Sequence, residues 1–455
     1  MKKIIYTCLP VLLAAMATGC SSDTASDILP ENPQIPVQEE NVIKAPLEVD
    51  NDITALRVVQ EAVTVDLVKT IIESSDRTEN VVFSPFSIYT AMSMLANGTD
   101  GENLKEILDF LHITDQSEEL RERTKLFPLF PPTGQEEKAL EFINRNNARL
   151  LGNIPYLDEA VTFKMANSVW TDTGFDISPR FTDIMTSAYN APVFTHDFTT
   201  ENVCELINTW VGEKTDNLIP QLMTEPLSGP LALTTAMYFK GLWNQPFEPQ
   251  NTTKEAFTCS DGTEVTVDMM HHQKVKAYLG VAYGAHTLTL TFGNNLYYIT
   301  FLLPVPGADI PQIVADLNLG KFRDWELSLA YDPGIDYGET EVFLPKFSVK
   351  AEYDLCDILK ALGVNGIFSP AQWNGLTDSK QPLCLRNAVH STAFSIDETG
   401  SEGASSSGLA LGGGHPMHRP DPLPERIFRI DRPFIFTVME YNCTIPLLVG
   451  CINKL

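Results

Sequence analysis

The chain has 455 residues, of which 44% are hydrophobic and 20% are charged. These values fit a protein with a large core and exclude general disorder. The 59 acidic residues outnumber the 32 basic ones, giving a formal net charge of −27. Phosphate contacts require clustered Lys and Arg, so this composition argues against nucleic-acid binding. The excess of acidic residues is typical of a soluble surface.

The first twenty residues have the pattern of an export signal. Lys2 and Lys3 precede a short apolar stretch, residues 4–17, which is too short and too early for a membrane-spanning helix. The stretch ends in Ala-Thr-Gly-Cys, which resembles a bacterial lipoprotein cleavage box, although Ala17 stands where Leu is usual. We therefore expect a signal peptide over 1–19, lipidation of Cys20 and anchoring to a bacterial membrane, with the outer membrane favoured. The alternative is an ordinary signal peptide; both take the protein out of the cytoplasm.

Residues 20–52 are rich in Pro, Asp, Glu, Ser and Asn and indicate a tether. From Ile53 onward, apolar residues recur at helical spacing as far as Ile72 and predict an amphipathic helix. Similar spacing predicts further helices over 87–95 and 104–111. Helices therefore dominate the first part of the globular region.

The later half of the chain is rich in predicted strands. Residues 286–292 alternate polar and apolar side chains, and a Gly-Asn-Asn turn leads into 296–303. Further strands are predicted over 341–350, 384–396, 434–439 and 445–452. Helices followed by antiparallel strands predict an α+β fold.

One long segment, residues 399–424, interrupts this pattern. Its first half is rich in Gly and Ser, and its second half carries four prolines. A loop of this length inside a compact domain is usually functional. The chain has eight cysteines, none in a close Cys-x-x-Cys pair, so zinc and dithiol chemistry are disfavoured and buried free thiols are expected, with a disulfide left open.

Several motifs in this order and spacing resemble the serpin family over residues 53–455. Asn80–Ile88 looks like the family's junction between two helices. Tyr-Phe-Lys-Gly-x-Trp at 238–243 and Leu-Pro-Lys-Phe-Ser at 344–348 resemble a central strand and a later strand. The segment near the C-terminus, residues 428–436, resembles the family's C-terminal signature. The resemblance implies a single domain of three β-sheets with eight or nine helices, although length alone would suggest two or three domains.

The resemblance also implies that the chain is not an enzyme but an inhibitor of serine, and possibly cysteine, endopeptidases. In the family, a protease cleaves the long loop and forms an acyl-enzyme, and the cut loop inserts as a strand into the main sheet and traps the protease. Insertion requires small hinge residues. The expected hinge is Glu398, Gly400, Ser401, Glu402, Gly403, Ala404, Ser405 and Ser407. The inward residues Ser401, Gly403, Ser405 and Ser407 are small and uncharged, which favours insertion over a merely flexible loop.

By the same resemblance, Glu398 pairs with Lys346 beside Trp243 and gates the start of insertion. Lower in the sheet, Ser84, Ser87 and His390 form a shutter in which His390 is a hydrogen-bonded core residue rather than a catalytic base. Thr235 stands where the family usually has Asn, so we expect this shutter to lack an amide.

The scissile bond is the least constrained prediction. Counting from Glu398 places it at Gly414–His415, but the loop is longer than is usual in the family. Met417–His418 is ranked first, because it offers a bulky apolar residue to chymotrypsin-like, elastase-like or subtilisin-like pockets, and Leu411–Gly412 is a third candidate. Pro420 after Arg419 disfavours trypsin-like cleavage.

Other functional classes fit less well. Gly403–Ser407 lacks the final Gly of a nucleophile elbow, and the Gly run at 412–414 is too loose for a phosphate loop. His415 with His418, or His271 with His272, lacks further ligands for a metal site. We expect no cofactor, and a monomer whose partner is a target protease. A non-inhibitory serpin acting as a binding protein is the alternative.

Overall fold

The computed structural model describes residues 43–113, 135–326, 336–400 and 426–455, apart from a few positions between 216 and 230 and between 372 and 387. All of them belong to one compact unit, Gln38–Leu455. The predicted signal peptide, Cys20 and the tether as far as residue 42 lie outside the described residues. Across the described part of the chain, no helix combines the length and the apolar composition that a membrane span needs.

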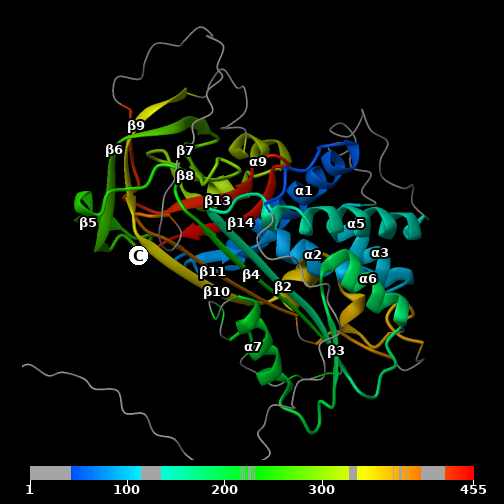
Figure 1. The fold of residues 1–455 in the computed structure, drawn as a ribbon. Coiled ribbons are helices and arrows are strands. Elements are labelled where there is room, and N and C mark those ends of the chain that lie inside the picture. Colours follow the sequence, from blue (N-terminus) through cyan, green and yellow to red (C-terminus); the bar gives the residue numbers. More distant parts are fainter. Residues whose placement is uncertain are drawn as a thin grey trace, which may run out of the picture. The chain divides into compact units, whose positions relative to one another are not determined.

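Helices account for most of the first half of the described chain. The nine described α-helices are α1 (Asn51–Ser74), α2 (Pro85–Ala96), α3 (Gly101–Phe110), α5 (Glu136–Leu151), α6 (Pro179–Tyr189), α7 (Val203–Lys214), α8 (Ile310–Ala315), α9 (Leu319–Glu326) and α10 (Leu355–Ala361). Three short 3-10 turns are η1 (Ile154–Tyr156), η2 (Pro249–Asn251) and η4 (Gly366–Phe368). In Figure 1, α1, α2, α3, α5 and α6 gather on one side of the strands.

A five-stranded sheet crosses the molecule, with the order β10-β11-β4-β2-β3. Its long strands run side by side in Figure 1, with α7 beside them. The strands are β2 (Val161–Asp172), β3 (Val193–His196), β4 (Leu231–Gly241), β10 (Phe347–Asp354) and β11 (Ala388–Ile396). This sheet carries the candidate site.

The remaining described strands form a nine-stranded sheet, ordered β1-β14-β13-β8-β7-β6-β9-β12, with β5 paired to β6. They are β1 (Val81–Phe83), β5 (Thr253–Thr258), β6 (Glu264–Ala282), β7 (Ala285–Phe292), β8 (Tyr297–Pro304), β9 (Asp336–Pro345), β12 (Ile427–Arg429), β13 (Phe434–Glu440) and β14 (Ile445–Ile452). The predicted α+β class is confirmed. Two of the three expected sheets are joined, because β6 is 19 residues long and pairs with β5, β7 and β9.

Three element predictions need correction. The helix predicted from Ile53 is α1, but it is buried around most of its circumference rather than amphipathic, because it contacts α2, α5, α8, α9, α10 and β14. The strand predicted over 341–350 is two strands in different sheets, β9 and β10, divided at Lys346. The strand predicted from Cys384 begins at Ala388.

Residues 43–50 of the predicted tether lie against the body of the protein. The Lys44 amide donates to the carbonyl of Tyr156 at 2.7 Å, and the Asn153 side chain donates to the carbonyl of Ala45 at 2.9 Å. Leu47 packs against the main core. The tether's last residues are therefore held by backbone hydrogen bonds and an apolar contact.

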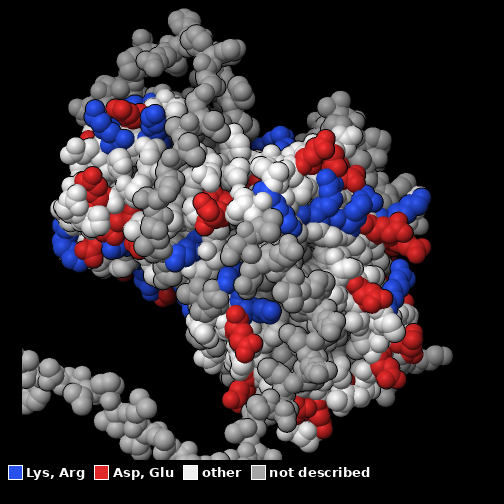
Figure 2. Space-filling view, viewed as in Figure 1, with Lys and Arg blue, Asp and Glu red and all other residues white. Residues whose placement is uncertain are grey.

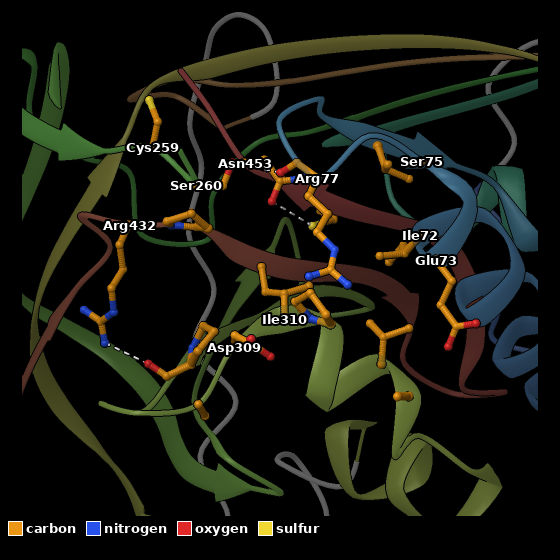
Figure 3. Close-up of a pocket in the computed structure, with 18 of the residues that line it drawn as sticks. Ile72, Glu73, Ser75, Arg77, Cys259, Ser260, Asp309, Ile310, Arg432 and Asn453 are labelled. Carbon is orange, nitrogen blue, oxygen red and sulfur yellow. Dashed lines mark hydrogen bonds between the residues drawn. The ribbon is translucent and has the colours of Figure 1, made fainter. Parts of the chain in front are cut away.

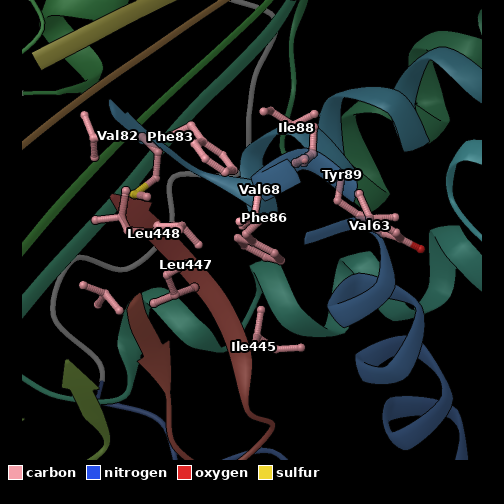
Figure 4. Close-up of a cluster of buried hydrophobic side chains, with 14 of the residues drawn as sticks. Val63, Val68, Val82, Phe83, Phe86, Ile88, Tyr89, Ile445, Leu447 and Leu448 are labelled. Carbon is pink, nitrogen blue, oxygen red and sulfur yellow. The ribbon is translucent and has the colours of Figure 1, made fainter. Parts of the chain in front are cut away.

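The main core lies where α1, α2 and β1 meet β14. Figure 4 shows Phe83 and Phe86 facing Leu447 and Leu448, with Val63 and Val68 of α1 nearby; all six are buried. On the face in Figure 2, acidic and basic side chains are interspersed. The six described cysteines are free thiols, and five of them are buried.

Candidate functional site: the loop hinge and the central strand pair

The five-stranded sheet contains a parallel pair at its centre. β4 and β11 pair in parallel from Leu233 opposite Ala388 to Tyr238 opposite Ala393. Their outer neighbours, β2 and β10, are antiparallel to them. The register between β4 and β11 ends there, although β4 continues to Gly241 and β11 to Ile396. The two strands are therefore unpaired over their last three residues, before a bridge between Leu242 and Gly400 joins the chain again beyond them.

A tight turn follows β11 and begins the loop. The Asp397 carboxylate accepts hydrogen bonds from the Thr399 amide at 2.8 Å, the Thr399 hydroxyl at 2.7 Å and the Gly400 amide at 3.2 Å. Gly400 has a φ of 140°, and a Cβ there would lie 2.1 Å from the carbonyl oxygen of Gly241. Only glycine fits this position, since a side chain would meet backbone in a conformation that L-residues rarely adopt.

Trp243 holds this turn against the end of β4. Its backbone amide donates to the Thr399 carbonyl at 2.9 Å, and its indole nitrogen donates to the Asp397 carbonyl at 2.9 Å. The indole also stacks on Phe292, with ring centroids 4.7 Å apart. The turn that begins the loop is thus held to the end of β4 by two hydrogen bonds from Trp243, whose buried ring is fixed by its stacking on Phe292.

The expected pairing of Glu398 with Lys346 is present. Lys346 Nζ lies 2.8 Å from Glu398 Oε2, and the Thr252 hydroxyl donates to Oε1 at 2.7 Å. Burial opposes ionisation of Glu398, but these two hydrogen bonds outweigh it and hold its pKa below the usual range. The hydrogen bond with Glu398 raises the pKa of Lys346. The pair is charged at neutral pH and joins the hinge to the junction between β9 and β10.

The predicted shutter residues meet beneath the same strand pair. The Ser84 backbone amide donates to His390 Nε2 at 3.0 Å, and the Thr392 hydroxyl lies 2.8 Å from the same nitrogen. Ser84 Oγ accepts from the Ser87 amide at 3.0 Å and so caps α2. These contacts connect the start of α2 to β11.

His390 is fully buried, and burial lowers its pKa to about 3. Because Nε2 accepts from a backbone amide, the proton of the neutral ring is on Nδ1. Within the described residues, Nδ1 has no hydrogen-bond partner. His390 is therefore a neutral hydrogen-bond acceptor in the core, where both the ring and the Thr392 hydroxyl beside it are fully buried.

Thr235 lies between His390 and Asn167 in the paired strands β11, β4 and β2. Its hydroxyl donates to Asn167 Oδ1 at 2.9 Å, and both residues are buried. Asn167 therefore brings an amide to the neighbouring strand β2, and the loss of an amide from the shutter at position 235 stays a prediction. Sequence reasoning missed Asn167 and Thr252, since neither follows a local motif. Asp397 could have been found from its Asp-x-Thr-Gly turn pattern.

The rest of the predicted loop lies outside the described residues. This applies to the hinge beyond Gly400, which comprises Ser401, Glu402, Gly403, Ala404, Ser405 and Ser407, and to the bonds at 411–412, 414–415 and 417–418. Of the other histidines considered, His271 contacts Glu341 at 2.8 Å and stacks on Phe343. The described residues hold no group of three or more His, Cys, Asp or Glu side chains suited to a metal ion.

Comparison with known proteins adds the family. The sequence profile described as Serpin (serine protease inhibitor) matches residues 59–455. Mouse neuroserpin is 30% identical over 82% of this chain and 85% of its own length. Human serpin B11 is 28% identical over 83% of this chain and 94% of its own length. The native structure of the thermophilic serpin tengpin superposes with a TM-score of 0.73 at 21% identity, covering 93% of this chain and 99% of tengpin. The structure of human thyroxine-binding globulin in its thyroxine complex also superposes with a TM-score of 0.73. It is 22% identical and covers 89% of this chain and 99% of the globulin. The chain belongs to the serpin family.

Proposed function

We propose that the protein is a suicide-substrate inhibitor of serine endopeptidases, which traps the acyl-enzyme by inserting its cleaved loop between β4 and β11. The observation that carries this proposal is the parallel pair at the centre of the sheet, whose strands are unpaired over their last three residues just before the loop leaves β11. The family profile supports protease inhibition in general. The trapping mechanism and the target are the proposal.

The topology gives insertion a driving force. A strand that turns back after Gly400 and runs between β11 and β4 is antiparallel to both, because those two strands run in the same direction. One parallel pairing is then replaced by two antiparallel pairings, which are more stable per residue and engage more backbone groups. β4 has 11 residues, and residues 401–411 provide a strand of the same length, roughly 36 Å when extended.

The hinge sequence suits such a strand. In a strand, alternate side chains point to opposite faces, so Ser401, Gly403, Ser405 and Ser407 share the inward face, which Leu409 extends. Small uncharged side chains enter a closed sheet without a large steric or desolvation cost. Because residue 405 lies on this inward face, a charged substitution there should stop insertion.

The other end of the loop explains why cleavage is required. β12, which follows the loop, pairs with β9 from Ile427 opposite Glu341 to Arg429 opposite Phe343. The Arg429 guanidinium lies 3.5 Å from the centre of the Phe343 ring and pairs with Glu255. An uncut loop is therefore held at β11 and at β9 in two different sheets, and cutting it frees the β11 end to insert.

The fold does not by itself distinguish an inhibitor from a binding protein, because a thyroxine-binding globulin shares it. A protease panel separates the two. The purified protein is incubated with chymotrypsin, pancreatic elastase, subtilisin and trypsin, and the products are examined on denaturing gels and by mass spectrometry. An inhibitor gives an SDS-stable adduct and a released peptide that begins at His418, or at His415 or Gly412. Cleavage in the loop with every protease remaining active would favour the non-inhibitory alternative.

We propose further that Cys20 is lipidated and anchors the protein to the outer membrane, which brings the loop to proteases outside the cytoplasm. The sequence before Cys20 is the support for this proposal. Mass spectrometry of the membrane-extracted protein should show an N-terminal acylated Cys20, and Cys20→Ala should release the protein from the membrane fraction. A mature N-terminus elsewhere, with no acyl chain, would establish the ordinary signal peptide instead.

A further inference from the structure

A cavity of about 640 Å³ lies apart from the loop hinge and shares no residue with it. Its lining comes from the end of α1 and the residues after it, from Val81 of β1, from the end of β5, from the chain between β8 and α8 and α8 itself, from Arg432 and Pro433, and from the end of β14. Figure 3 shows side chains from these elements around one hollow. The volume falls in the range of pockets that bind small molecules, about 300–1,000 Å³.

The walls are largely aliphatic. Ile72 and Val81 contribute to the lining, as do Val305 from the turn before α8 and Ile310 and Val314 from α8 itself. The described residues that line the cavity include no aromatic side chain. Walls of this kind provide dispersion contacts and water exclusion without a stacking surface, so they suit an aliphatic chain better than a planar ring.

One cation of the lining is available to a ligand. The Arg77 guanidinium makes no hydrogen bond or ion pair with any described residue, and Figure 3 shows it extending toward Ile310. The other lining cation, Arg432, donates to Asp431 at 3.0 Å and to the Pro304 carbonyl at 2.9 Å. Arg77 is therefore the group with free donors for an anionic head.

The acidic side chains of the lining limit the charge of that ligand. Asp76 accepts from the Thr78 amide and hydroxyl, both at 2.9 Å, and Asp309 accepts from the Gln312 amide at 2.9 Å. Glu73 is exposed at the rim. These carboxylates would repel a second negative charge, so the cavity favours a ligand with a single carboxylate.

We propose that this cavity binds an aliphatic monocarboxylate of the fatty-acid class, with its carboxylate on Arg77 and its chain against the wall formed by Ile72, Val305 and Ile310. Guanidinium and carboxylate are matched in geometry and form charge-assisted hydrogen bonds, here with an Arg77 side chain that is exposed at the rim of the cavity. The proposal is independent of the loop mechanism.

Isothermal titration of the purified protein with sodium decanoate, below its micelle concentration, tests the proposal. We expect one saturable site. Arg77→Gln should weaken binding about tenfold, because it removes the charge but keeps a polar side chain. Ala315→Phe, at an exposed position on the rim, should abolish binding by filling the entrance. Each variant should melt at the wild-type temperature.

Arg180→Gln is the matched control, because Arg180 is exposed and makes only a 3.8 Å contact with Glu137. It should bind decanoate as the wild type does. Acetate, which has the carboxylate without the chain, and 1-octanol, which has a chain without the charge, should not bind saturably in the same range. The proposal is overturned if wild type shows no saturable binding, if Arg77→Gln and Arg180→Gln bind alike, or if octanol binds as well as decanoate.

Discussion

The ion pair between Glu398 and Lys346 should stabilise the closed hinge, and Glu398→Gln tests this. The substitution keeps an oxygen for Thr252 but places an amide against the ammonium. Exposed ion pairs contribute about 0.2–1 kcal/mol, and breaking a buried pair costs about 3–5 kcal/mol. Here the Glu398 side chain is 11% exposed and that of Lys346 is 38% exposed, so solvent screens part of the interaction. We expect a loss of about 1–2 kcal/mol in the free energy of the first unfolding transition.

Equilibrium denaturation of the uncleaved protein measures this loss, with Glu339→Gln as the control. The Glu339–Lys274 pair spans 3.5 Å, and both side chains are at least 60% exposed, so its loss should cost under about 0.5 kcal/mol. The folded-state pKa of Glu398 is depressed. Its contribution is therefore present above the unfolded pKa of about 4.3 and is lost as the pH falls through the lower folded value. Equal effects of the two substitutions, or a difference from wild type that persists unchanged well below pH 4, would refute the reasoning.

Three further predictions follow from the same site. His390→Leu should destabilise the protein by about 1–3 kcal/mol at neutral pH, because the buried Ser84 amide loses its acceptor. The folded-state pKa of His390 is about 3, so as the pH falls from 7 to 5 the unfolded chain takes up a proton, near the usual pKa of about 6.5, that the folded protein does not; wild-type stability should therefore fall over this range by more than that of His390→Leu, and equal slopes in denaturation experiments would contradict this. Gly400→Ala should lower the melting temperature more than Gly307→Ala, because a Cβ at Gly400 meets the Gly241 carbonyl, whereas one at Gly307, also at positive φ, meets nothing within 4 Å; equal shifts would contradict this. Ser405→Arg should convert the inhibitor into a substrate, because residue 405 would enter the sheet on its inward face, whereas Ser406→Arg, on the opposite face, should not. The molar ratio of protein needed to inhibit chymotrypsin measures this. Equal ratios for the two variants would contradict the predicted alternation of inward and outward residues.

Local patterns in the sequence predicted most of the elements that build the fold. The alternation over 286–292 and the Gly-Asn-Asn turn correspond to β7 and the turn into β8, where Gly293 and Asn295 have positive φ. The pairing of Glu398 with Lys346 was predicted because both residues lie in motifs that resemble the family's. Short-range spacing and recognisable motifs were sufficient for these features.

Long-range register was not predictable in this way. Asn167 meets Thr235 across 68 residues and Thr252 meets Glu398 across 146, so no periodicity relates them. The break at Lys346 also escaped the pattern, because apolar residues continue on both sides of it while the chain passes from one sheet to the other. The burial of α1 around most of its circumference depends on six elements that pack against it, and its own spacing does not reveal them.

The central claim, insertion of the loop between β4 and β11, is tested most directly by thermal melting of the protein before and after a single cut in residues 411–418. The account predicts that the cut protein melts at a clearly higher temperature, because a new strand joins two antiparallel neighbours at the centre of the sheet. An unchanged melting temperature after complete cleavage would mean that the loop stays outside the sheet, and the trapping mechanism would be wrong.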